Sequence, residues 1–349
     1  MLHAFSRIGV LSAAALLPVT SQALTFNLTD VTPGGMDPAA LAGFQDAAAI
    51  WENFLTDTMV VNLDIRFDGR NFDNSPMAPT TLGSALRVAE VHSYAAVKGA
   101  LIADTLSAND ATATSNLPAG SSLSFLTNDA NTSAVITDNN GSGNNNFLDV
   151  NRANAKALGL LSGNPADNDA SIAFNNSFSW DFDQSDGVGA GLQDFVGVAT
   201  HEIGHALGFR SGVDAVDATH GAGPSAPTDL NGLAVHTVLD LFRYSAAGQL
   251  NYATGGAPYY SIDGGATNLA LFSTGSFNGD GRQASHWKDN LAIGLLDPTA
   301  NPPGQLNLLS QLDIDAIDAI GYDLNLIPEP SSALLALVAL GATMRRRRS

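Results

Sequence analysis

The residues best suited to chemistry are two histidines and a glutamate in residues 194–209, DFVGVATHEIGHALGF. His201 and His205 are four positions apart, so a helix would place both rings on one face, where they can bind one metal ion. Imidazole nitrogens suit zinc, and a catalytic zinc site has three protein ligands and one open position. Zinc lowers the pKa of bound water to about 7, and Glu202 would lie beside the ion to accept the proton. The spacing predicts a Zn2+-dependent hydrolase whose third ligand lies elsewhere.

A helix over residues 194–209 is also predicted without reference to the histidines. Apolar residues recur at three- and four-residue steps and form one stripe, made up of Leu192, Val196, Ala199, Ile203 and Ala206. Gly208 then follows as a helix stop. The alternative is an HExxH pattern that arose by chance in an ordinary helix. Because the chain has only 7 histidines in 349 residues, a metal site is favoured.

Apolar periodicity upstream predicts elements that could support this helix. Residues 37–56 form a predicted helix, with Asp37 as N-cap and Pro38 at its first position. Apolar and polar residues alternate at 60–67, which predicts a half-buried strand.

A further helix is predicted over residues 82–103, and short strands are predicted at 121–127 and 134–137. His92 lies in the predicted helix without a nearby partner. A structural role is therefore favoured for His92 over metal binding.

The last strand predicted before the metal helix covers residues 171–174, and it is followed by Phe178, Trp180 and Phe182. We expect this strand to run along the edge of the cleft, where an extended peptide could pair with it. An ordinary buried strand is the alternative.

Residues 138–149, DNNGSGNNNFLD, imitate a calcium-binding loop. Gly143 occupies the sixth place, and oxygen donors stand at Asp138, Asn140, Ser142, Asn144 and Asp149. The twelfth place holds Asp instead of the usual Glu, and Asn/Gly tracts often form turns. A Ca2+ site and a flexible turn both stay open.

Composition limits the class of protein. With 45% hydrophobic and 14% charged residues, the chain should fold as a globule with an ample core. It has no cysteine, which excludes disulfides and thiolate ligands. The net charge of -19 argues against a nucleic-acid partner and favours solubility.

The first 23 residues have the layout of a secretory signal peptide. A short basic start is followed by an apolar run and a small-residue exit, and cleavage by signal peptidase is expected after Ala23. An uncleaved anchor is the alternative, but the apolar run is too short to span a bilayer comfortably.

The last 23 residues, 327–349, carry a second address. Pro328-Glu329-Pro330 precedes an apolar run at 331–344 and four arginines at 345–348. The run would cover only about 21 Å of a roughly 30 Å hydrocarbon core, so it predicts a short transmembrane helix that anchors the chain transiently in the inner membrane. This segment resembles a PEP-CTERM sorting tail. The resemblance implies removal by an exosortase and export to the cell surface or extracellular matrix of a Gram-negative bacterium.

The third metal ligand is not where the compact metzincin pattern HExxHxxGxxH would have it, because that position is Ser211. The candidates further along the chain are Asp214, His220, His236 and His286. The segments QASHWK at 283–288, GLLDP at 294–298 and LDIDAIDAIGY at 312–322 resemble the leishmanolysin-type branch of the metzincins.

That resemblance implies that His286 is the third ligand, after a long insertion. It also implies a tight turn beneath the metal in which Leu296 replaces the family's methionine. An alternative is that Asp214 binds the metal and His286 is structural.

The insertion covers about residues 211–284 and contains strand-like segments at 239–244 and 259–265, which predict a small sheet-bearing elaboration. A final helix is predicted over residues 311–320. Its start has Ser310 as N-cap with Asp313 in the capping-box position. Ile314, Ile317 and Ile320 should pack this helix below the site.

The predicted fold is an α+β, metzincin-like zincin with an N-terminal mixed twisted sheet. Its catalytic domain is expected over residues 24–326, with subdomains 24–209 and 210–326 and the cleft between them. The predicted activity is that of an exported zinc endopeptidase acting on polypeptides. A non-catalytic surface or matrix binding protein on a degenerate metalloprotease scaffold is the alternative. Three tyrosines are available to stabilise an oxyanion, Tyr259, Tyr260 and Tyr322.

Overall fold

The computed structural model describes residues 24–162 and 164–325, so both predicted export signals, 1–23 and 327–349, lie outside the described residues. Within these ranges helices and several sheets are mixed along the chain, which confirms the α+β class. No helix in this part of the chain is long and apolar enough to cross a membrane.

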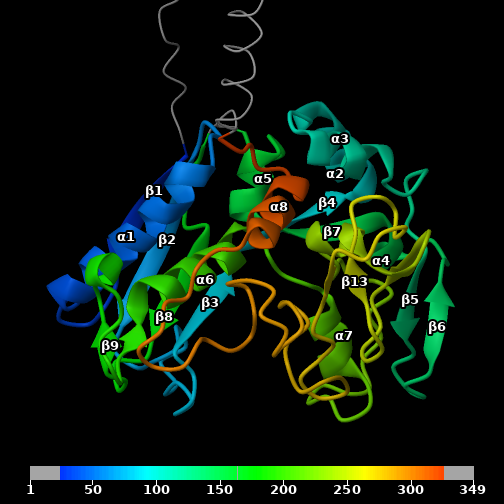
Figure 1. Ribbon diagram of the computed structural model, residues 1–349. Coiled ribbons are helices and arrows are strands. Elements are labelled where there is room, and N and C mark those ends of the chain that lie inside the picture. Colours follow the sequence, from blue (N-terminus) through cyan, green and yellow to red (C-terminus); the bar gives the residue numbers. More distant parts are fainter. Residues whose placement is uncertain (1–23, 163, 326–349) are drawn as a thin grey trace, which may run out of the picture.

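A four-stranded mixed sheet forms one side of the molecule (Figure 1). Its order is β1 (Thr25–Asp30), β2 (Val60–Phe67), β8 (Ala170–Phe174) and β3 (Gly83–Arg87). The first three strands are parallel, and β3 runs antiparallel at the edge. In β2 the predicted apolar face is buried, but Asn62 and Arg66 on the other face are buried too. The strand is therefore more enclosed than a half-buried strand.

Two helices pack together against this sheet. They are α1 (Pro38–Phe54) and α6 (Phe195–Leu207), which lie side by side in Figure 1. Asp37 caps α1 as predicted. The indole Nε1 of Trp51 on α1 donates to the carbonyl oxygen of Thr200 on α6 at 2.9 Å, and both residues are buried. Helix α6 is thus held on one side by a long-range hydrogen bond inside the core.

The predicted helix over residues 82–103 is wrong in its first half. That half forms β3 and β4 (Ala89–Ser93), and helix α2 covers only Tyr94–Asp104. Ser93 is the N-cap of α2, and its side chain accepts a hydrogen bond from the Ala96 N–H at 3.2 Å. β3 pairs with β8, and β4 pairs with β7 (Phe147–Asn151). Pairing with strands far along the chain overrides the local helix preference of this segment.

The strand expected to border the cleft lies inside the sheet instead of at its edge. Residues 171–174 do form a strand, but β8 lies between β2 and β3 and is fully buried. The edge position belongs to β3, for which a helix was predicted. A short parallel pair, β9 (Trp180–Asp181) and β10 (Gln193–Asp194), then leads into α6.

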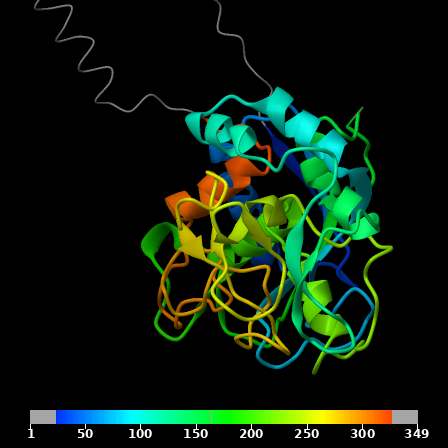
Figure 2. The ribbon, with the colours of Figure 1, turned by 90° about the vertical axis from the view of Figure 1, so that its right-hand side faces the viewer.

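The predicted insertion does not form a sheet of its own. A six-stranded sheet combines β5 (Phe125–Asn128) and β6 (Val135–Asp138) with β11 (Arg243–Ala246), β12 (Gln249–Asn251), β13 (Tyr259–Tyr260) and β14 (Ala270–Leu271). The join is the parallel pairing of β12 with β5. Figure 2 shows the yellow strands of the insertion beside the teal hairpin.

The strand boundaries inside the insertion also differ from the prediction. Residues Leu239–Phe242 form a 3-10 helix instead of a strand, and only Tyr259–Tyr260 of the second segment is extended in the sheet. The insertion contains one α-helix, α7 (Val213–Thr219), directly after α6.

The remaining α-helices of the described residues are short. They are α3 (Ala108–Ser115), α4 (Gly143–Asn146), α5 (Arg152–Ala157) and α8 (Gln311–Ala319). Ser310 caps α8 with Asp313 in a capping box, as predicted. Ile314, Ile317 and Ile320 are buried as expected. Helix α8 packs against α3, far along the chain from it.

Candidate metal centre

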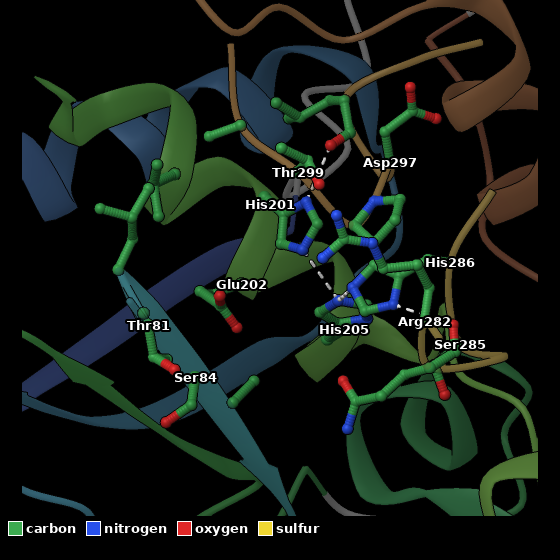
Figure 3. Close-up of a pocket in the computed structure, with 18 of the residues that line it drawn as sticks. Thr81, Ser84, His201, Glu202, His205, Arg282, Ser285, His286, Asp297 and Thr299 are labelled. Atoms are coloured by element: carbon green, nitrogen blue, oxygen red, sulfur yellow. Dashed lines mark hydrogen bonds between the residues drawn. The ribbon is translucent and has the colours of Figure 1, made fainter. Parts of the chain in front are cut away.

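Three histidine rings from two distant segments converge in the cleft (Figure 3). The Nε2 atom of His205 lies 3.0 Å from that of His201 and 3.1 Å from that of His286. They are the one group of three or more His, Cys, Asp or Glu side chains within metal-binding distance among the described residues. The expected meeting of His286 with the two helical histidines is therefore confirmed.

The spacing of these nitrogens suits one tetrahedral ion. Nitrogens about 2.0–2.1 Å from a tetrahedral zinc lie roughly 3.3 Å apart. The two Nε2 separations given above are close to this value. The three residues thus fit a metal bound by three imidazoles with one position left for a small ligand.

The second nitrogen of each ring faces a backbone carbonyl oxygen. The Nδ1 of His201 is 2.8 Å from the oxygen of Leu295, the Nδ1 of His205 is 2.7 Å from that of Phe209, and the Nδ1 of His286 is 3.2 Å from that of Gln283. A carbonyl can only accept, so each Nδ1 carries the proton and each Nε2 keeps a free lone pair. This orientation of ligand rings by outer hydrogen bonds is typical of metal sites.

Burial favours the neutral form of all three rings. It lowers the pKa of His201, and burial together with repulsion from His201 lowers the pKa of His205 to about 3. Burial, reinforced by His205, holds the pKa of His286 well below its usual range. Neutral imidazole is the form that binds a metal, so protons need not be displaced at neutral pH.

Glu202 lies beside the histidine cluster and next to the edge strand β3 (Figure 3). Burial raises the pKa of its carboxyl to about 8, and the backbone N–H of Ala85 opposes that shift. A Cβ atom at Gly83 would come within 3.2 Å of Glu202 Oε1, so the strand passes close to the carboxylate. Glu202 is thus a buried carboxyl at the point where β3 meets α6.

Leu296 lies in a turn next to the helix that carries His201 and His205. Leu296 is fully buried and packs against Gly204, where a Cβ atom would come 2.8 Å from Leu296 Cδ2. Its carbonyl oxygen accepts the N–H of Trp287 at 3.0 Å. Leu296 therefore fills the apolar floor below the two helical ligands.

The other candidate ligands lie elsewhere. Asp214 accepts hydrogen bonds from the N–H of Ala284 at 2.6 Å and from the hydroxyl of Ser285, so it holds the segment before His286 and does not join the cluster. The Nε2 of His220 is 3.0 Å from the hydroxyl of Thr254.

Two further histidines also lie outside the cluster. His236 packs against Phe125 and Tyr252, and the ring of His92 is 3.6 Å from a carboxylate oxygen of Glu90. His92 lies in β4 and not in the helix predicted for it.

The three tyrosines that were available to stabilise an oxyanion are bound to backbone oxygens away from the metal cluster. The hydroxyl of Tyr259 donates to Gly265, that of Tyr260 donates to Asp315, and that of Tyr322 donates to Leu207. None of them lines the cleft. Burial holds the pKa of Tyr260 and Tyr322 well above the usual range.

The predicted calcium loop has a different conformation. A strand and the four-residue helix α4 replace the open loop, and hydrogen bonds join the Asn144 amide to Asp138 at 2.9 Å and the Ser142 hydroxyl to Asn144 at 2.6 Å. The Asn140 amide donates to Asn231 at 3.0 Å. Asp149 pairs with two arginines, Arg87 and Arg210. Hydrogen bonds thus link Asp138, Ser142 and Asn144 to one another, whereas two guanidinium groups hold Asp149.

A long cleft surrounds the histidine cluster. It is lined by the edge strand β3, by helix α6 and, across from β3 in Figure 3, by residues of the segments 282–286 and 297–303. Arg282 lies beside His286 in this cleft (Figure 3). All five residues of β3 line this cleft together with the three histidines.

No family model, curated protein or solved structure matches this chain.

Three features of the site were not expected from the sequence: the edge strand β3, the Leu295 carbonyl that orients His201, and the anchoring role of Asp214. A carbonyl leaves no sequence signal, and β3 has few of the β-branched residues that mark a strand.

Proposed function

We propose that this protein is an exported zinc endopeptidase of the metzincin type, with its third ligand supplied after a long insertion. The observation that carries the proposal is the convergence of His286 with His201 and His205, next to Glu202 and an open cleft. The HExxH spacing and the resemblance of the downstream segments support the same class. Export through a signal peptide and a sorting tail is part of the proposal.

His201, His205 and His286 would hold the ion through their Nε2 atoms. When bound, zinc supplies a Lewis acid and a water of lowered pKa. Glu202 then accepts a proton from the attacking water and returns it to the leaving amine, as a general base and then a general acid. The carboxyl lies beside the histidine cluster, so one group can take the proton and pass it on.

A polypeptide substrate would lie along β3. This strand pairs with β8 on one side and lines the cleft with the other. An edge strand offers unpaired N–H and C=O groups to an extended chain, so main-chain hydrogen bonds can position a scissile bond without fixing the substrate sequence.

The test is metal analysis of the purified protein combined with cleavage of casein and a peptide library. We expect one zinc ion per chain and zinc-dependent cleavage. Glu202→Ala should abolish most of the activity while zinc stays bound, and Glu90→Ala is the matched control because Glu90 does not line the cleft. Activity that survives Glu202→Ala contradicts the proposal. Bound zinc without any cleavage favours the binding protein on a metalloprotease scaffold.

A further inference from the structure

Asp313, in the first turn of α8, has an unusual set of hydrogen-bond donors. Its side chain is fully buried. One oxygen accepts the indole N–H of Trp287 at 2.8 Å and the N–H of Leu296 at 3.2 Å. The other accepts the N–H groups of Leu295 and Ser310, both at 2.7 Å. One carboxylate thus binds donors from three separate parts of the chain.

The capping box of α8 does not require this arrangement. Asp110 holds the same position in the capping box of α3, with Ser107 as N-cap. Its carboxylate accepts the N–H groups of Leu106 and Ser107, which are both within four residues. Asp313 makes the equivalent local bond to Ser310 and adds three donors from 17 to 26 residues upstream. The comparison separates a local capping role from a long-range one.

The long-range donors belong to the segments that hold the metal ligands. Leu295 places its carbonyl oxygen 2.8 Å from the Nδ1 of His201. Trp287 follows His286 directly, and its N–H donates to the Leu296 carbonyl oxygen. Asp313 therefore touches both the turn that orients one ligand and the residue next to another.

The turn can approach the Asp313 carboxylate closely because residue 294 is glycine. A Cβ atom at Gly294 would overlap both the Asp313 carboxylate and the Ser310 hydroxyl. Glycine at position 294 lets the turn fold directly onto the carboxylate. The turn is thus shaped to receive Asp313.

We propose that Asp313 is a positioning residue for the metal centre, which fixes the rings of His201 and His286 from the C-terminal helix. The inference rests on the metal-binding part of the proposed function and not on peptide cleavage. In this proposal the Asp313 carboxylate supports the turn at Leu295 and Leu296 through hydrogen bonds, whereas the Leu296 side chain contributes only apolar packing. An outer hydrogen-bond partner of this kind typically contributes 10- to 100-fold to metal affinity.

Asparagine at this position tests the role. Asp313→Asn keeps the size of the side chain but replaces one acceptor oxygen with an NH2 group, which would face N–H donors. We expect the zinc affinity of the purified full-length protein, measured by competition with a chelator, to fall about 10- to 100-fold. The visible spectrum of the Co2+-loaded variant should also change, because it reports ligand geometry. Asp110→Asn is the matched control and should leave both readouts unchanged.

The outcomes separate this inference from the proposed function. Wild-type protein that binds zinc, together with an Asp313→Asn variant of unchanged affinity and Co2+ spectrum, overturns the role of Asp313 alone. Wild-type protein that binds neither ion contradicts both proposals. Cleavage need not be observed for either result.

A milder variant covers the case in which Asp313→Asn does not fold. Trp287→Phe removes one donor to the carboxylate and keeps an aromatic ring in the core. We expect a smaller loss of zinc affinity and a smaller change in the Co2+ spectrum than for Asp313→Asn. An unchanged spectrum for Trp287→Phe with bound Co2+ contradicts the proposal. In the double variant the two losses should be less than multiplicative, since both changes remove the same contact.

Discussion

The two helical ligands and the third ligand are positioned in different ways. His201 and His205 are one turn apart on α6, so a single helix sets their spacing. His286 lies in a segment without helix or strand, and it reaches the cluster because Asp214 holds the residues before it and Asp313 holds Trp287 after it. The first pair depends on local structure, whereas the third ligand depends on contacts between distant parts of the chain.

This difference has a consequence for how the centre can fail. A change that leaves α6 folded should keep two ligands in place. A change in the downstream anchors should release the third ligand without unfolding the core.

The largest effect is expected on α6 itself. Glu202→Gln removes the proton acceptor but keeps the helix, so kcat/KM should fall about 10²- to 10⁴-fold while zinc binds normally. The measurement is steady-state cleavage of a peptide substrate together with zinc analysis. A variant that loses zinc along with activity would show that Glu202 supports the ligands and not the chemistry.

The downstream half is tested by two acids on α7. Asp214→Asn should weaken zinc binding about 10- to 100-fold, because Asp214 anchors Ala284 and Ser285 beside the third ligand. Asp217 is the control, since it binds the N–H groups of Phe277 and Asn278 in the same insertion. Asp217→Asn should lower the melting temperature but leave the zinc affinity of the folded protein nearly unchanged. Equal zinc affinities for both variants would contradict a specific anchor at Asp214.

A pH dependence should appear where α8 docks. Burial raises the pKa of Asp57 to about 8 and of Asp104 and Asp318 to about 7, and neighbouring carboxylates add to the shift, Asp323 for the first two and Asp110 for Asp318. Raised values mean that the folded state binds more protons than the unfolded state. The stabilisation is complete below the ordinary aspartate pKa and is lost as pH rises through 7 to 8.

The melting temperature should therefore fall by a few degrees between pH 6 and pH 9. Thermal unfolding followed by circular dichroism measures it. Asp318→Asn should flatten the dependence, because the amide cannot ionise. A melting temperature that rises over this range would contradict the raised pKa values of Asp57, Asp104 and Asp318.

The smallest effect is expected in the turn. Leu296→Met restores the residue that the metzincin resemblance implies, but leucine already fills the space against Gly204. A volume-conserving exchange of this kind should change the free energy of unfolding by less than about 1.5 kcal/mol. Zinc affinity should stay the same. A large gain in affinity would show that sulfur, and not only volume, is needed beneath the cluster.

The same division explains what could be predicted from the sequence. Helices α1, α6 and α8 carry their start signals within a few residues, at Asp37, Asp194 and Ser310, and all three were located from local patterns. The helix predicted over residues 82–103 was wrong across 82–93, because the pairing partners of this part lie far downstream in β7 and β8.

For the site, the spacing of His201 and His205 was sufficient to pair them. His286 could be chosen only through a resemblance, since no local pattern links positions 205 and 286. Its anchors were not predicted, because a buried carboxylate that binds distant N–H groups looks in sequence like any other aspartate. Long-range hydrogen bonds leave no periodic signal.

The most direct test is zinc titration by calorimetry of the purified wild-type protein and of His201→Ala, His205→Ala and His286→Ala. The account predicts one ion per wild-type chain. It also predicts a loss of affinity in each single variant that is greater than the loss in Asp214→Asn. Undiminished zinc affinity in His286→Ala would contradict the central claim that the third imidazole completes the centre.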